Sequence, residues 1–168
     1  ELDRETTGRG PVREASRKTI DTLRYRQSGG PLVTSEALSM MLGNAHADAL
    51  LQFDMKNEMD EIGAAGVAHL AEHFSSMAQR IIVSGGSLAL INALGDSIPG
   101  LRRGIDPTDR LVETWQAHGL MAMEQQLNDE ITAAQVPEMV YLSWELILAA
   151  AEEGLDLIDS CHSVGCAV

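Results

Sequence analysis

Two histidines and a glutamate in the middle of the chain have the types and the spacing of metal ligands. His69, Glu72 and His73 form the pattern H-x-x-E-H, in which the two imidazoles are four residues apart. On an α-helix, residues four apart lie on the same face, so both rings can reach one cation with the carboxylate beside them as a base. The pattern therefore indicates a divalent-metal site, with Glu72 as the candidate catalytic residue of a metal-dependent enzyme.

The segment GVAHLAEHF, which contains this pattern, resembles the motif region of the inverted zinc peptidases. The resemblance implies a zinc ion held by His69 and His73, with a third protein ligand on a downstream helix. No later stretch of the sequence repeats the pattern of that family. Two other interpretations stay open. The three side chains can belong to an ordinary solvated helix face, or they can meet another subunit, whose Glu145 or Glu152 completes a carboxylate–histidine site.

Cys161 and Cys166 are a second group of potential ligands, close to the end of the sequence. Together with His162 they offer three soft ligands, but a zinc site needs a fourth ligand and usually has C-x-x-C spacing. We expect residues 161–168 to form an exposed tail in which the two cysteines are either free or joined in a small disulfide loop. Gly165 makes the turn between them feasible.

The segment Ser84-Gly85-Gly86-Ser87 has the glycine and serine content of a phosphate-binding loop. It lacks the Lys-Ser/Thr ending of a P-loop and the G-x-G-x-x-G spacing, and it follows a helical rather than a strand pattern. We therefore interpret this segment as the end of one helix, followed by Ser87 as the N-cap of the next.

The charges are unevenly distributed along the chain. The net charge is −13, yet seven of the 12 Lys and Arg and only five of the 25 Asp and Glu lie in the first 26 residues, so that this segment carries +2 and the rest −15. The overall charge argues against nucleic acid as a partner, because phosphate binding needs a basic surface.

The opposite signs of these two parts suggest that the basic segment docks on the acidic surface of a neighbouring subunit. We expect this contact to weaken with salt. The alternative interpretation is that the basic segment is a mobile tail and that the acidic residues form an ordinary solvated helix face. The basic residues that we assign to the contact are Arg13, Arg17, Lys18, Arg24 and Arg26, and the acidic residues are Glu138, Glu145, Glu152, Asp156 and Asp159.

The composition favours an all-α fold. Hydrophobic residues make up 45% of the chain but aromatic residues only 4%, and the apolar side chains are mostly Ala, Leu, Ile and Met, which suit packing between helices. We expect a single-domain bundle of about five helices. Its parts are a flexible basic arm (1–30), the helical bundle (31–160) and the cysteine-containing tail (161–168).

Local signals give the expected helices. A Thr34 or Ser35 cap starts the first, Asp106-Pro107 starts the fourth, and Pro137 opens the last. Gly63 and Gly66 weaken the second, the central helix of the bundle, and can interrupt it. The expected ranges are 34–43, 45–82, 88–94, 107–134 and 138–160, with a short helical stretch at 12–26 in the arm.

Three functions fit these features. The first, which the charge asymmetry favours, is a non-catalytic, self-assembling structural or scaffold protein that forms a homo-oligomer. The second is a metal-dependent enzyme or a metal-binding protein that uses a divalent metal at His69, Glu72 and His73. The third is a bundle that binds a small molecule in a methionine-rich core, composed of Met40, Met41, Met55, Met59, Met77, Met121 and Met123.

The sequence shows no signal for a membrane or for secretion. No apolar run reaches the roughly 20 residues that a helix needs to cross a bilayer, and no secretory leader pattern is present. We therefore expect a cytoplasmic protein.

Overall fold

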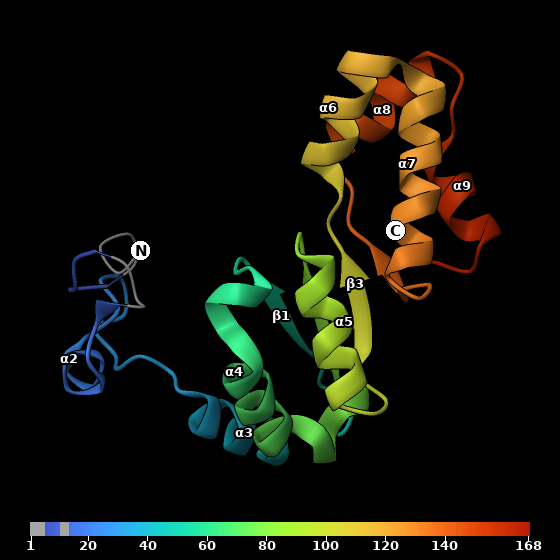
Figure 1. Ribbon diagram of the computed structural model, residues 1–168. Helices are drawn as coiled ribbons and strands as arrows, with labels where there is room; N and C mark the ends of the chain where they lie inside the picture. Colours follow the sequence, from blue (N-terminus) through green and yellow to red (C-terminus); the bar gives the residue numbers. More distant parts are fainter. Residues whose placement is uncertain (1–5, 11–13) are drawn as a thin grey trace. The chain divides into compact units, whose positions relative to one another are not determined.

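The computed structural model describes residues 6–10 and 14–168 (Figure 1). The chain divides into two compact units, Glu1–Met41 and Leu42–Val168. Arg13, one of the residues assigned to the basic contact, lies outside the described residues. None of the described helices combines the length and the apolar character that a membrane crossing requires.

The N-terminal unit contains a short helix, α2 (Arg17–Thr22), which begins after the N-cap Ser16. The chain leaves the helical conformation at Leu23, whose ψ is 154°. Beyond this residue, isolated antiparallel bridges pair Thr6 with Tyr25 and Arg24 with Pro31. The helical stretch expected at 12–26 is therefore shorter in the structure.

The next helix, α3 (Ser35–Asn44), forms where the sequence predicts it. The Thr34 hydroxyl accepts a hydrogen bond from the Ala37 backbone N–H at 3.3 Å, so Thr34 acts as the N-cap.

The larger unit contains a parallel β-sheet, and the expected all-α bundle of helices is therefore wrong. Among the described residues the sheet has four strands in the order β1-β2-β3-β4. Every neighbouring pair is parallel, and Phe53 lies opposite Val83 in the register. The strands are β1 (Leu51–Met55), β2 (Ile81–Gly85), β3 (Arg102–Ile105) and β4 (Met139–Val140).

The first two strands replace the ends of the central helix expected at 45–82. In β1 the burial alternates between neighbouring residues, and Gln52 and Asp54 are exposed. In β2 all five residues are buried, including the β-branched run Ile81-Ile82-Val83. Such short apolar runs suit a strand, because β-branched side chains pack well on a pleated surface.

The helices of this unit are also divided differently from the prediction. Gly63, with φ 63° and ψ 174°, interrupts α4. This agrees with the prediction that the glycines of this segment can interrupt the helix. Gly119, with φ 89°, splits the helix expected at 107–134. The helix expected at 138–160 is replaced by β4 and two shorter helices. The observed elements are α4 (Met59–Phe74), the 3₁₀-helix η2 (Ser75–Arg80), α5 (Leu88–Ser97), α6 (Thr108–His118), α7 (Leu120–Ala133), α8 (Trp144–Glu152) and α9 (Leu157–Ser163).

The helices pack on one face of the sheet. The ring of Phe53 on β1 contacts that of Phe74 on α4, with 5.0 Å between the ring centroids, and α4 lies beside α5 (Figure 1). Ile105 and Val140 belong to the main hydrophobic core together with buried residues of α6, α7, α8 and α9. Side chains alternate along a strand, so Asp54, between Phe53 and Met55, points to the opposite face.

The C-terminal segment 161–168 is exposed except at its two cysteines, which belong to the core. Cys161 in α9 is 0% exposed, Cys166 is 2% exposed, and both are free thiols. The Val140 backbone N–H donates to the Ala167 carbonyl at 2.8 Å, which ties this segment to β4. Burial raises the pKa of the Cys161 thiol to about 11.

The methionines do not form a common core. Met123 is fully buried, but Met40, Met41 and Met121 are 65%, 61% and 75% exposed. These three exposed methionines are therefore not part of a buried core, and small-molecule binding by the methionines stays a prediction.

Candidate functional site at the carboxyl ends of the strands

A pocket of about 540 Å³ lies at the carboxyl ends of the four strands. Each strand is followed by a loop that contributes to its wall. In open sheets of parallel strands, ligands bind at this edge, because the loops after successive strands converge there. The polar lining includes Lys56 and Glu58 after β1, Ser87 after β2, Asp106 and Arg110 after β3, and Tyr141 after β4.

Gly85 allows the ends of β1 and β2 to approach closely. A β-carbon at this position would lie 2.3 Å from the backbone oxygen of Met55, so only glycine fits. The Gly85 carbonyl accepts a hydrogen bond from the Asp106 backbone N–H at 3.1 Å. The close approach and this hydrogen bond place the ends of β1, β2 and β3 next to one another beside the pocket.

Gly104 makes room for the ring of Tyr141. A β-carbon on Gly104 would lie 2.8 Å from Cε2 of Tyr141 and 3.1 Å from Cβ of Ser84. The Tyr141 side chain therefore covers the sheet beside the pocket. Burial raises the pKa of its phenol, so the hydroxyl keeps its proton at neutral pH and can donate a hydrogen bond.

Arg110 is fixed by a buried carboxylate. Its Nε donates to Oε1 of Glu130 at 2.9 Å and its Nη2 donates to Oε2 at 2.5 Å, while Nη1 donates to the Gly86 carbonyl at 3.1 Å. Glu130, on α7, is only 7% exposed and also accepts from the Gln126 amide at 3.0 Å. The hydrogen bonds with Glu130 raise the pKa of Arg110, which is therefore a permanent, preorganised cation in the pocket wall.

Lys56 is the second cation of the pocket. Its ammonium lies 2.9 Å from the Asp54 carboxylate, and both side chains are mostly exposed. The hydrogen bond with Asp54 raises the pKa of Lys56, with smaller contributions from the carboxylates of Asp106 and Asp109. The pocket therefore brings charges of both signs together.

Ser87 differs from the other serine N-cap of the pocket wall. It is the N-cap residue of α5 and only 8% exposed, yet its side chain makes no capping hydrogen bond. Ser143, the N-cap of α8, instead accepts a hydrogen bond from the Leu146 N–H at 3.2 Å. The Ser87 hydroxyl is thus left at the N-terminus of α5, where backbone N–H groups attract negative charge.

The structure confirms Ser87 as an N-cap and corrects our interpretation of the residues before it. Ser84 and Gly85 end strand β2, and Gly86 and Ser87 join it to helix α5, so the segment does not end a helix. The P-loop and dinucleotide-binding spacings remain absent. The segment does, however, follow a strand, so the absence of a preceding strand no longer argues against an anion-binding loop.

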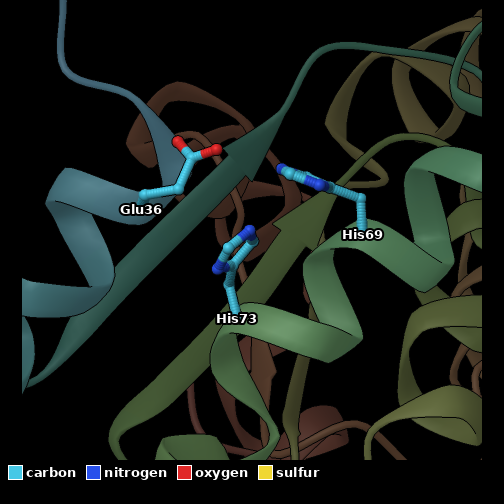
Figure 2. A group of neighbouring side chains, drawn as sticks. All are labelled: Glu36, His69 and His73. Carbon is cyan, nitrogen blue, oxygen red and sulfur yellow. The ribbon is translucent and has the colours of Figure 1, made fainter.

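His69 and His73 lie on the same side of α4, with their ring centroids 4.5 Å apart (Figure 2). Glu72 is exposed on the same helix, and it is not part of the group of potential ligands that contains the two rings. Glu36, also drawn in Figure 2, belongs to α3 in the N-terminal part of the chain. Metal binding by the histidines stays a prediction.

Three of the residues assigned to the basic contact, Arg17, Arg24 and Arg26, have partners within their own unit. Arg17 forms an ion pair with Asp21 at 3.0 Å. The Arg24 guanidinium donates to the Leu23 carbonyl at 2.7 Å, and that of Arg26 donates to the Thr6 carbonyl at 2.5 Å. Lys18 is exposed on α2. Docking on another subunit stays a prediction.

The acidic residues do not form one helix face, because the helix expected at 138–160 does not exist. Glu138 precedes β4 and forms an ion pair with Arg102 at 2.6 Å, which lowers the pKa of Glu138. The other four are divided between two helices: Glu145 and Glu152 lie in α8, Asp156 is the N-cap of α9, and Asp159 lies in its first turn.

Sequence reasoning missed the pocket because it missed the strands. A signal was present, since the alternating run Leu51–Met55 and the β-branched run Ile81–Val83 are each followed within a few residues by polar groups. Polar residues directly after two strands mark the edge of a parallel sheet where sites form.

Comparison of the chain with models of protein families, with curated proteins and with solved structures gave no match. A functional conclusion therefore depends on the geometry of the pocket.

Proposed function

We propose that the unit Leu42–Val168 is an enzyme domain that binds a small polar molecule carrying an anionic group in the pocket at the carboxyl ends of its strands. One observation carries this proposal: the loops after all four parallel strands contribute polar residues to a single pocket of about 540 Å³. This volume is in the range of small-molecule sites, roughly 300–1,000 Å³.

The anionic group of the ligand is suggested by the wall next to α5. The N-terminus of this ten-residue helix, with the Ser87 hydroxyl, offers hydrogen-bond donors to a negative charge. The cations Lys56 and Arg110 line the same pocket. A phosphate or carboxylate group at this position would accept hydrogen bonds from the helix. Lys56 and Arg110 are further donors, each already paired with a carboxylate of the protein.

The carboxylates of the pocket suggest the second property of the ligand. Glu58, Asp106 and Asp109 line the wall, and Asp106 contributes to the raised pKa of both Lys56 and Arg110. An ionised carboxylate is a hydrogen-bond acceptor and can take a proton from a hydroxyl or from water. We therefore propose a substrate that carries hydroxyl groups beside its anion, with acid–base catalysis by a carboxylate and the neutral Tyr141 hydroxyl as a donor.

Calorimetric titration with inorganic phosphate and with acetate tests the anion site. We expect saturable binding of at least one anion by the native protein and a loss of about tenfold or more in affinity for Ser87→Ala and Lys56→Ala, since each removes a contact to a charged group. Ser76→Ala, at an exposed position of η2, is the matched control and should bind like the native protein. Equal affinity in all four proteins would contradict the proposal.

The assembly role of the basic segment is a separate proposal. It is supported by the opposite net charges of the first 26 residues and the rest of the chain. We propose a homo-oligomer held partly by this contact. Light scattering tests it, because removal of residues 1–30 should lower the oligomer mass, and an unchanged mass would count against a docking contact.

A further inference from the structure

The two histidines of α4 are positioned by the packing of their helix. Val67 and Phe74 are buried, 5% and 1% exposed, and Phe74 also contacts Phe53 of the sheet. These anchors fix the rotation of α4 about its axis. His69 and His73, four residues apart, are consequently held on one side of the helix, His69 exposed and His73 half-buried.

The rings converge on one another. Their centroids are 4.5 Å apart with an interplanar angle of 71°, and each offers a ring nitrogen such that the two nitrogens lie within 4.8 Å. Two nitrogens bound to one tetrahedral ion at about 2.1 Å are separated by about 3.4 Å. A small rotation of the two side chains brings their nitrogens to this separation, while the backbone stays in place.

We propose that His69 and His73 form a two-imidazole binding site for a divalent transition-metal ion of the Zn²⁺ and Cu²⁺ class. Imidazole nitrogen is a preferred ligand of these ions, whereas Mg²⁺ and Ca²⁺ prefer oxygen ligands. By the general order of stability of such complexes, Cu²⁺ binds more tightly than Zn²⁺. The site is distinct from the pocket, which lies at the carboxyl ends of the strands and contains neither histidine.

Titration of the full chain with Cu²⁺ and Zn²⁺, each as the free metal ion in a buffer that does not chelate it, tests this site. The variants are His69→Ala and His73→Ala, and the matched control is His118→Ala, an exposed histidine in the last turn of α6. Because two linked ligands bind far more tightly than either alone, each α4 variant should lose about tenfold or more in affinity. The control should keep the native affinity, and Mg²⁺ should not bind at this site.

The electron paramagnetic resonance spectrum of the Cu²⁺ complex identifies the ligands directly. We expect coupling to two imidazole nitrogens in the native protein and in His118→Ala, and to one in either α4 variant. Native-like affinity and an unchanged spectrum in the α4 variants would overturn the assignment. Circular dichroism of each variant, which should match the native protein because neither ring is in the core, separates lost ligation from lost fold.

Discussion

Replacing Ser87 and Ser143 by alanine should have opposite consequences for stability and for binding. Both serines are N-cap residues that line the pocket. The Ser143 hydroxyl accepts the hydrogen bond of the Leu146 N–H at 3.2 Å, whereas the Ser87 hydroxyl makes no such bond although the residue is only 8% exposed. If the Ser87 hydroxyl binds a ligand instead of capping the helix, its removal should not lower the free energy of unfolding of the ligand-free protein.

The magnitudes follow from these contacts. Loss of a side-chain cap costs about 1 kcal/mol, so Ser143→Ala should lower the free energy of unfolding by this amount and the Tm by about 2–4 °C. Removal of a largely buried hydroxyl that lacks its capping partner is close to neutral, so Ser87→Ala should stay within about 0.5 kcal/mol of the native protein.

Urea unfolding with and without phosphate measures both effects. At a phosphate concentration ten times its Kd, binding should stabilise the native protein by about 1.4 kcal/mol. Ser143→Ala should show the same increment, and Ser87→Ala should lose most of it. A cost of about 1 kcal/mol for Ser87→Ala without phosphate, together with an unchanged phosphate increment, would refute the assignment of this hydroxyl to a ligand.

Three further changes test the fold of the larger unit. Arg110→Ala leaves the Glu130 carboxylate buried without its bidentate partner. Urea unfolding should show that the free energy of unfolding falls by about 2–4 kcal/mol. The double variant with Glu130→Gln should lose much less, because no buried charge is then left unpaired. Gly85→Ala places a β-carbon 2.3 Å from the Met55 carbonyl oxygen, so it should cost at least about 2 kcal/mol, because backbone must move; a cost near zero would contradict the close approach of β1 and β2. The raised pKa of Cys161, about 11 against an ordinary value of 9.0, favours the protonated thiol in the folded state. The protonated thiol therefore stabilises the folded protein fully below pH 9, and the free energy of unfolding should fall by about 2 kcal/mol as the pH rises towards 11. Cys161→Ala should remove this part of the pH dependence, which urea unfolding at several pH values measures.

The parts of the fold that sequence reasoning predicted correctly are those determined by local chemistry. The helix start at Thr34 and the N-cap at Ser87 depend on a few neighbouring residues, and both are present. The break at Gly63 likewise follows from the properties of glycine. The break at Gly119, which separates α6 from α7, follows from the same property of glycine.

The strands were missed because their stability depends on distant residues. A short buried apolar run, such as Ile81–Val83 in β2, has the same pattern in a helix and in a parallel strand. The charged β3 is held by contacts across the chain, among them the ion pair of Arg102 with Glu138. The two-residue β4 is recognisable only through its pairing with β3.

The candidate site depended on the same distant pairing. The H-x-x-E-H pattern was visible because its ligands are close in sequence, and the structure does bring the two rings together. The pocket residues Lys56, Ser87, Asp106 and Tyr141 are spread over most of the larger unit. Only the parallel order of the strands brings them to one edge, so no single local motif contains them.

The central claim is that the pocket at the carboxyl ends of the strands is a ligand site, and a nuclear magnetic resonance titration of the ¹⁵N-labelled chain with inorganic phosphate tests it most directly. We predict saturable shifts of the backbone amides at Gly86, Ser87 and Leu88, at the N-terminus of α5, together with the Arg110 side-chain signals. Shifts confined to other parts of the chain, or no saturable shifts at a phosphate concentration that binds in calorimetry, would contradict the account.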